Sequence, residues 1–318
     1  MDNIVKTPEV SVIVPVYNGE EYIERCLRSL LTQDFTKSYE IVVINDGSAD
    51  RTLEIVERIA ENNSIIRVFS QENGGISAAR NAGLAHSRGK YVMFTDSDDY
   101  VERRYISALY DAAERSGADI ACCNYRDFIA GGSIGIASIF RHRPGVFDSE
   151  KILGALLRDV TLRSFSCNKI FRRELFVRNN IAYPLGQHFE DVRVMPRLFW
   201  HSDKIAVIND ALYNYVHRKG SITSTMTPKK VFQYIGAYDG IREFLDETGE
   251  FSRYVWSFRF LGIKIAFTVI PMLIGCKRRD KSLKLGKCCK QAVRRLYNAA
   301  AGSSGYSKKA RNVRKFSV

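Results

Sequence analysis

The sequence lacks the short motifs of the most familiar nucleotide-binding and zinc-binding folds. No G-x-G-x-x-G follows a hydrophobic run, and the glycine spacing of 83–90 does not fit a P-loop, which would also need Ser or Thr where Tyr91 stands. No C-x-x-C pair or Cys/His ligand spacing occurs, which argues against a structural zinc site. The seven cysteines are an odd number and no charged-then-apolar leader is present, so we expect reduced thiols in the cytoplasm.

Acidic residues are scarce at the end of the chain. Residues 276–318 contain 14 Lys and Arg but one acid, Asp280, which leaves 34 basic and 34 acidic residues before Cys276. A tail of one sign indicates a polyanionic partner (a membrane surface, a nucleic acid or an anionic substrate) or a solvated end. Residues 281–297 have the pattern of a basic amphipathic helix on an anionic membrane, with Leu285, Cys289, Ala292 and Leu296 on its apolar face. The neutral body carries no nucleic-acid-reading motif, so we expect no nucleic-acid partner.

Long uninterrupted hydrophobic runs are also missing. The most hydrophobic stretch, 254–276, contains Arg259, Lys264 and Pro271, and only 265–276 is free of charge. A helix that spans a bilayer needs about 20 apolar residues. We therefore expect a core or interfacial helix here, and membrane insertion stays an open alternative.

Short runs rich in Val and Ile alternate with helical patterns in the first half of the chain. The runs at 10–14, 40–44 and 90–95 are nearly continuous in apolar character, which is typical of parallel strands buried on both faces. Strands that alternate with helices predict an α/β fold with a doubly wound, mostly parallel sheet and helices on both of its faces. From Pro228 onward the pattern is helical.

Each of these runs is followed by a polar cluster. The clusters are Pro15-Val16-Tyr17-Asn18, Asn45-Asp46-Gly47-Ser48 and Asp96-Ser97-Asp98-Asp99. All three should lie at the carboxyl ends of strands, where open α/β sheets bind ligands. The sequence therefore predicts one ligand-binding rim.

The carboxylates of these clusters suggest specific chemistry. Asp96 and Asp98 could share one hard cation, completed by substrate phosphates, or the cluster could cap the next helix. Val101 and Ser107 stand where an EF-hand needs Gly and Glu, which excludes that motif. Asp46 could accept a ring N–H from a base, or could serve only its own Asp-Gly-Ser turn.

A glycine pair precedes an Ala-rich helical pattern at 74–87. The backbone N–H groups of Asn73-Gly74-Gly75, together with Arg80, could face an anion at the helix start. A plain turn is the alternative for the glycines.

The ordered set of motifs resembles family 2 glycosyltransferases with the GT-A fold. The set comprises 10–18, 45–50, 73–83 and 96–99, and the resemblance covers about residues 8–105. Segments 167–171, 190–191 and 213–223 resemble acceptor-side motifs of bacterial polysaccharide members. The helical extension matches no motif.

The resemblance implies donor-side roles for seven residues. These are base-pocket lining for Pro15, Val16 and Tyr17, base hydrogen bonding for Asp46, nucleotide contact for Arg80, ribose contact for Asp96, and direct ligation of a divalent cation, Mn²⁺ or Mg²⁺, for Asp98. Uracil is the base in many members.

The resemblance also implies acceptor-side roles. Asp191 matches the catalytic base of the family; Glu190 is the alternative base, or both could be a helix N-terminal acid pair. Arg218 and Ser221 lie where some members close a loop over the diphosphate.

The implied protein is an inverting glycosyltransferase that transfers a sugar from a nucleotide diphosphate, most often UDP, to a saccharide or lipid-linked saccharide in cell-surface polysaccharide synthesis. Residues 8–118 would bind the donor, 119–225 would hold the acceptor and the base, and 226–318 would be a helical extension. The basic tail at 276–318 would hold the enzyme on the anionic inner face of the plasma membrane.

Two other functions remain possible. A sugar nucleotidyltransferase would need a basic Gly-rich loop where 17–21 is acidic. The other is a membrane or nucleic-acid interaction protein that acts through the basic tail.

Overall fold

The computed structural model describes residues 7–129, 133–134, 143–217 and 226–301. The chain forms two compact units. The first comprises 1–152, 165–186 and 198–218, and the second comprises 153–164, 187–197 and 219–318. This division follows contacts and does not identify ligands, so the predicted assignment of 8–118, 119–225 and 226–318 to donor, acceptor and extension stays a prediction.

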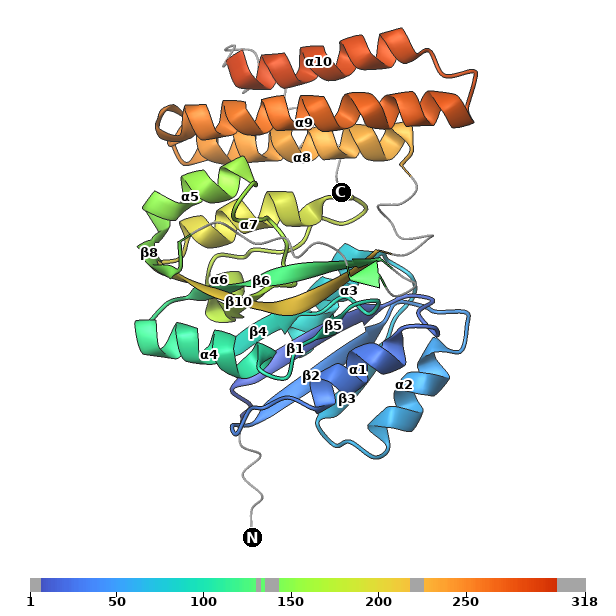
Figure 1. The fold of residues 1–318 in the computed structure, drawn as a ribbon, viewed down its shortest axis with the longest axis vertical. Coiled ribbons are helices and arrows are strands. Elements are labelled where there is room, and N and C mark those ends of the chain that lie inside the picture. The colour runs from blue at the N-terminus through green and yellow to red at the C-terminus, as the bar shows by residue number, and fades with distance from the viewer. Residues whose placement is uncertain (1–6, 130–132, 135–142, 218–225, 302–318) are drawn as a thin grey trace. The chain divides into compact units, whose positions relative to one another are not determined.

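The first unit contains the described strands and the helices that pack on them (Figure 1). The strands are β1 (Val10–Val16), β2 (Tyr39–Asn45), β3 (Ile66–Ser70), β4 (Tyr91–Phe94), β5 (Tyr100–Val101), β6 (Ile120–Ile129), β7 (Ser133–Ile134), β8 (Gly145–Asp148), β9 (Lys169–Arg172) and β10 (Lys204–His217). Its helices are α1 (Ile23–Leu31), α2 (Thr52–Ala60), α3 (Ile76–His86), α4 (Tyr105–Ser116) and α6 (Glu174–Arg178).

The strands form one mixed sheet in the order β3-β2-β1-β4-β9-β6-β10-β5. Strands β3, β2, β1 and β4 pair in parallel, as do β6 and β10, whereas β9 is antiparallel to both of its neighbours. The predicted α/β sheet is confirmed. The antiparallel β9 was not predicted, because three of its four residues lie inside 167–171, which was assigned only as a motif.

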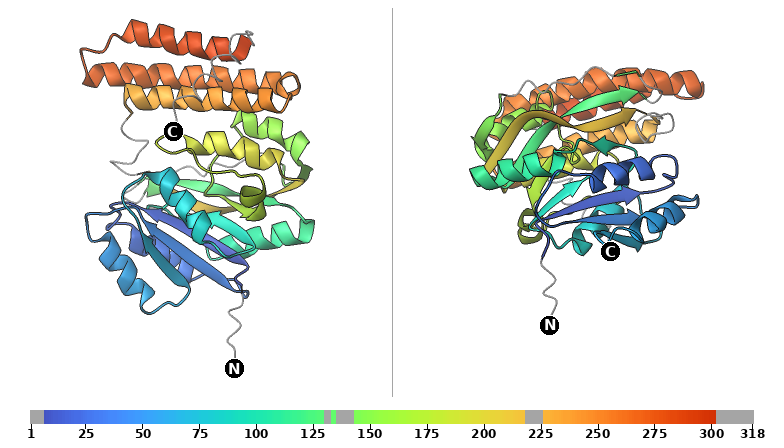
Figure 2. Two further views of the ribbon diagram at one scale, coloured as in Figure 1. Left: turned by 180° about the vertical axis from the view of Figure 1, so that it is seen from behind. Right: turned by 60° about the horizontal axis from the view of Figure 1, so that its bottom comes forward.

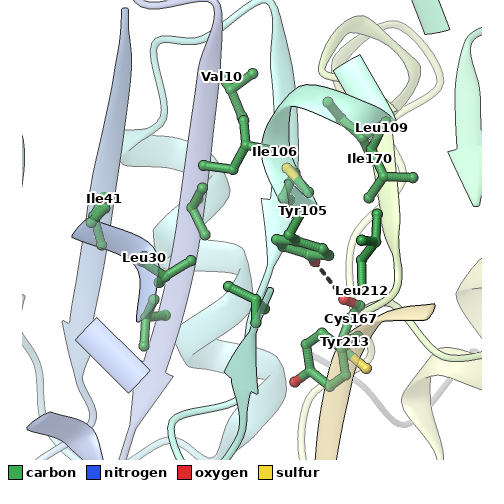
Figure 3. Close-up of a cluster of buried hydrophobic side chains, with 14 of the residues drawn as sticks. Val10, Leu30, Ile41, Tyr105, Ile106, Leu109, Cys167, Ile170, Leu212 and Tyr213 are labelled. Atoms are coloured by element: carbon green, nitrogen blue, oxygen red, sulfur yellow. Dashed lines mark hydrogen bonds between the residues drawn. The ribbon is translucent and has the colours of Figure 1, made fainter. Parts of the chain in front are cut away.

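Successive side chains of β1 point to opposite faces of the sheet, and helices cover both faces. Val10 and the other even-numbered residues of β1 pack in a cluster with α1 and α4 (Figure 3). Ile13 points to the opposite face, where α3 crosses β1. A Cβ at Gly83 of α3 would lie 2.2 Å from Ile13 Cγ2, so only glycine permits this close approach.

The second unit is helical. Helices α8 (Pro228–Glu247), α9 (Phe251–Arg279) and α10 (Leu285–Ala301) pack side by side, as Figure 2 shows from two further directions. Two helices, α5 (Ser149–Arg158) and α7 (Glu190–Trp200), have residues in both units. The predicted helical extension is confirmed over residues 228–301, and Pro228 follows the N-cap Thr227 in the position that proline favours.

Candidate active site

The ends of β1 and β2 are joined by hydrogen bonds between their polar clusters. Asn18 adopts a left-handed conformation (φ 47°), and its backbone N–H donates to Ser48 Oγ at 3.0 Å. The Ala49 N–H donates in return to Asn18 Oδ1 at 2.9 Å. The two clusters therefore form one rim, as the sequence predicted.

The predicted base-pocket residues differ in exposure. Pro15 and Val16 are buried within β1, and the β1–β4 pairing ends at Ile13, so no ladder on that side requires the N–H that Pro15 lacks. Tyr17 is 52% exposed. A ligand at this rim would meet the backbone of Pro15 and Val16 but the ring of Tyr17.

Asp46 binds the glycine turn that precedes α3. Its Oδ1 accepts hydrogen bonds from Gln71 Nε2 at 2.7 Å and the Gly74 N–H at 3.0 Å, and its Oδ2 accepts from the Gly75 N–H at 2.8 Å. The N–H groups of Gly74 and Gly75 therefore point at a carboxylate of the protein, which favours the plain-turn alternative for the two glycines. A carboxylate has about four acceptor sites, so base recognition by Asp46 stays a prediction.

Arg80 connects α3 to the third cluster. Its Nη2 donates to Asp96 Oδ1 at 3.0 Å, and its guanidinium lies 5.4 Å from the centre of the Tyr183 ring. The Arg80 side chain is 4% exposed, and that of Asp96 is 27% exposed. The structure thus brings Arg80 and Asp96 together, and Asp96 presents the more accessible face to a ligand.

The turn at 96–99 is anchored to β10. The Tyr213 hydroxyl accepts a hydrogen bond from the Asp96 N–H at 3.2 Å and donates to Asp99 Oδ2 at 2.6 Å. Asp99 Oδ1 accepts from the Val216 N–H at 2.7 Å. The next long helix, α4, begins only at Tyr105 with Arg104 as its N-cap, so helix capping does not explain this acidic cluster.

We expect Tyr213→Phe to weaken cation binding, because the turn at 96–99 would be held less firmly. The change removes the hydroxyl that bonds both the Asp96 N–H and an Asp99 oxygen, at a cost of about 1–3 kcal/mol in unfolding free energy. Tyr105→Phe is the matched control, because its equally buried hydroxyl donates to the carbonyls of Phe94 and Cys167 instead of bonding the Asp96 N–H and Asp99 (Figure 3). Both variants should melt earlier, but only Tyr213→Phe should need more Mn²⁺ for half-maximal activity; an equal Mn²⁺ requirement would contradict the positioning role.

The acidic turn concentrates negative charge. Burial, followed by the charges of Asp96 and Asp98, raises the pKa of Asp99 well above its usual range. Burial, followed by the charges of Asp99, Asp98 and Asp96, also raises the pKa of the Cys26 thiol. Arg25 Nη2 donates to the Asp98 backbone carbonyl at 2.6 Å, which fixes the peptide of that residue.

This donor set suits a hard divalent cation. Carboxylate oxygens are the ligands of Mg²⁺ and Mn²⁺, which protein sites often hold by one or two carboxylates together with substrate phosphates. Among the described residues no group of three or more potential ligands is gathered. Asp96 and Asp98 supply donors of the right type, and would hold such a cation together with the diphosphate of a bound donor.

The predicted base lies in the second unit. Glu190 and Asp191 occupy the first turn of α7, as an N-terminal acid pair would. Glu190 is 8% exposed, whereas Asp191 is partly exposed and hence more accessible to an acceptor. The exposure favours Asp191 over Glu190, and the role of each stays a prediction.

Helix α8 holds the backbone on both sides of this acid pair. Phe189 has φ 64°, a strained value for a bulky residue, and its ring stacks on Tyr234 at 4.5 Å between centroids. Arg193 donates to the Gly236 carbonyl, and a Cβ at Gly240 would lie 2.6 Å from Arg193 Nη1. Burial lowers the pKa of Arg193. We call these contacts of Phe189 and Arg193 the α8 clamp.

The remaining predicted loop residues, Arg218 and Ser221, lie outside the described residues. Sequence reasoning missed Asp99 and Tyr213 as supports of the acidic turn. The Asp99 signal was present in the sequence, since it extends the Asp-x-Asp pair by one carboxylate, but its partner in β10 is 114 positions away.

Comparison with known proteins decides the family. The model of glycosyl transferase family 2 matches residues 11–178, which is more than half of the chain. The chain belongs to glycosyl transferase family 2. Glycosyltransferase GlyA of Streptococcus pneumoniae is 36% identical over 235 residues, which cover 72% of this chain and 33% of that protein. The EpsH protein of Bacillus subtilis is 32% identical over 257 residues, which cover 79% of this chain and 73% of that protein.

Solved structures share the fold of this family 2 protein. Staphylococcus aureus TarS (residues 1–349), in complex with UDP-GlcNAc, superposes with a TM-score of 0.62 at 23% identity. The match covers 92% of this chain and 90% of the TarS chain. The Pyrobaculum calidifontis mannosyltransferase PcManGT, in complex with GDP-Man and Mn²⁺, gives 0.58 at 17% identity and covers 96% and 89%. These likenesses confirm the predicted GT-A-like fold, and the family confirms a glycosyltransferase.

Proposed function

We propose that this glycosyltransferase transfers a sugar from a UDP-sugar to a hydroxyl of a saccharide or lipid-linked saccharide, with inversion, in cell-surface polysaccharide synthesis. The observation that carries the proposal is the continuous set of hydrogen bonds along the rim. Asn18 with Ser48, Asp46 with Gly75, and Arg80 with Asp96 link the four donor-side motifs into one site. The UDP-GlcNAc complex of TarS, which shares the fold, supports the donor class.

The proposed reaction is a single displacement. The acceptor oxygen forms a bond to the anomeric carbon while the bond from that carbon to the diphosphate oxygen breaks, and the electron pair leaves with UDP. Asp191 takes the proton of the acceptor hydroxyl. Asp98, with Asp96 beside it, would hold a divalent cation, Mn²⁺ or Mg²⁺, whose charge stabilises the departing diphosphate. Arg80 keeps Asp96 oriented toward the donor.

A donor screen tests this proposal. The melting temperature of the full chain would be measured with UDP-, GDP-, dTDP- and CMP-sugars, each with and without Mn²⁺. We expect stabilisation by a UDP-sugar that depends on Mn²⁺, because protein carboxylates and the diphosphate share the ion. Turnover should then release UDP. Equal stabilisation by all nucleotides would contradict base recognition, and release of pyrophosphate would indicate a nucleotidyltransferase instead.

A further inference from the structure

Helix α9 is apolar on two opposite sides. One side is buried in the second unit: Tyr254, Phe258, Leu261, Ile265, Val269 and Leu273. The other side carries large exposed side chains at helical spacing: Trp256, Phe260, Ile263, Phe267 and Ile274. Trp256 is 77% exposed and Phe267 is 79% exposed, and aromatic residues gathered in this way on a surface mark an interaction site.

Helix α10 contributes to the same surface with residues that the sequence did not single out. The apolar face expected to meet a membrane includes Ala292 and Leu296, but both are buried where α10 packs on α8 and α9. Val293 and Tyr297, by contrast, are 47% and 69% exposed. They line a groove of about 510 Å³ together with Ile263 of α9. The exposed residues of the two helices therefore form one docking face: Trp256, Phe260, Ile263, Phe267, Ile274, Val293 and Tyr297.

Basic side chains surround the docking face. Arg259 lines the groove, and exposed Lys290 and Arg294 precede Val293 and Tyr297 by three positions, which places each pair on one side of the helix. Residues 276–301 contain nine Lys and Arg and one acid. Two copies of such a face would repel each other, whereas an anionic surface would attract it.

The length of α9 alone would allow it to cross a bilayer. It has 29 residues, with a mean hydropathy of 1.7 over its most apolar window. The buried side of α9, however, packs against other parts of the second unit. Lys264 Nζ lies 2.5 Å from Asp159 Oδ2 and also donates to the Asp159 carbonyl. These contacts favour a helix that would lie along a membrane over one that would cross it.

We propose that the docking face binds the interface of a bilayer that contains anionic phospholipids. The aromatic and aliphatic side chains enter the boundary between headgroups and acyl chains, and the surrounding cations contact the phosphates. This refines the predicted attachment through 276–318, because α9 supplies most of the apolar contact. It goes beyond the proposed function and stands or falls independently of the donor, the acceptor and the base.

The test is co-sedimentation of the full chain with vesicles of phosphatidylglycerol and phosphatidylcholine in a 1:1 ratio, and of phosphatidylcholine alone. We expect binding to the anionic vesicles only, weakened by salt. Phe267→Asp should reduce the partition coefficient between vesicles and water by about tenfold or more, because it places a charge where the docking face enters the bilayer. The double variant Lys290→Glu/Arg294→Glu should also lose binding.

Val177→Asp is the matched control. Val177 is 65% exposed on α6 of the first unit, so the same charge is introduced on a helix that does not belong to the docking face. It should bind like the wild type, and all variants should keep their melting temperature.

Unchanged vesicle binding by Phe267→Asp would overturn the proposal, as would equal binding to neutral vesicles. A dimer in light scattering that Phe267→Asp dissociates would assign the face to a second copy, and vesicle binding that persists in 1 M NaCl and alkaline carbonate would indicate a spanning helix.

Discussion

Asp98→Ala should abolish transfer while the protein remains folded. Stabilisation of the departing diphosphate by a cation amounts to several kcal/mol, so we expect kcat to fall on the order of 10³-fold or more. The backbone of this turn is held by Arg25 on the Asp98 carbonyl and by Tyr213 on the Asp96 N–H, and neither contact needs the Asp98 side chain. The measurements are the rate of UDP release at saturating donor and the Mn²⁺-dependent rise in melting temperature, both of which should be lost.

Asp111→Ala serves as the control for this prediction. Asp111 is an exposed acid on α4, and its removal changes the net charge by the same amount. This variant should retain the activity and the Mn²⁺ response of the wild type. An Asp98→Ala protein with undiminished transfer at saturating Mn²⁺ would refute the assignment of Asp98 to the cation.

Asp191→Asn should reduce kcat by about 10²–10⁴-fold, the usual contribution of a general base. The amide retains the size of the side chain but cannot accept the proton. The proposed function assigns donor binding to the rim residues of the first unit, so the UDP-sugar should still stabilise the protein in the presence of Mn²⁺. Rapid-quench measurement of transfer, combined with thermal shift for the donor, separates the two effects.

Glu190→Gln identifies which acid acts as the base. Glu190 is buried, so we expect this variant to lose less than tenfold in kcat and mainly to melt at a lower temperature. A larger loss of kcat in Glu190→Gln than in Asp191→Asn would exchange the two roles. Equal small losses in both variants would indicate that the pair acts only at the start of α7.

The donor rim was predictable from the sequence because its signals are local. Each strand is a short apolar run, and each cluster follows its strand directly, so parallel pairing brings the clusters to one edge. The contacts that support the rim are not local. Tyr213 reaches Asp99 only through the placement of β10 beside β5 and β6, which no pattern near either residue encodes.

The helical unit shows a different limit of sequence reasoning. Both sides of α9 are apolar, so periodicity alone cannot tell the packed side from the exposed one. The tail helix 281–297 was correctly predicted to be amphipathic, but the face with Ala292 and Leu296 is covered by neighbouring helices. The left-handed φ of Phe189 likewise had no signal, since nothing in its residue type favours that conformation.

The α8 clamp determines at which residues this enzyme can be joined to a relative in a chimaera. Phe189 and Arg193 flank the proposed base, and both are held by residues between Tyr234 and Gly240 of α8. A chimaera joined at residue 225 would supply foreign partners to these two side chains even though it leaves every motif residue in place. Exchange of acceptor preference between relatives should therefore transfer 187–197 together with α8 as a single module.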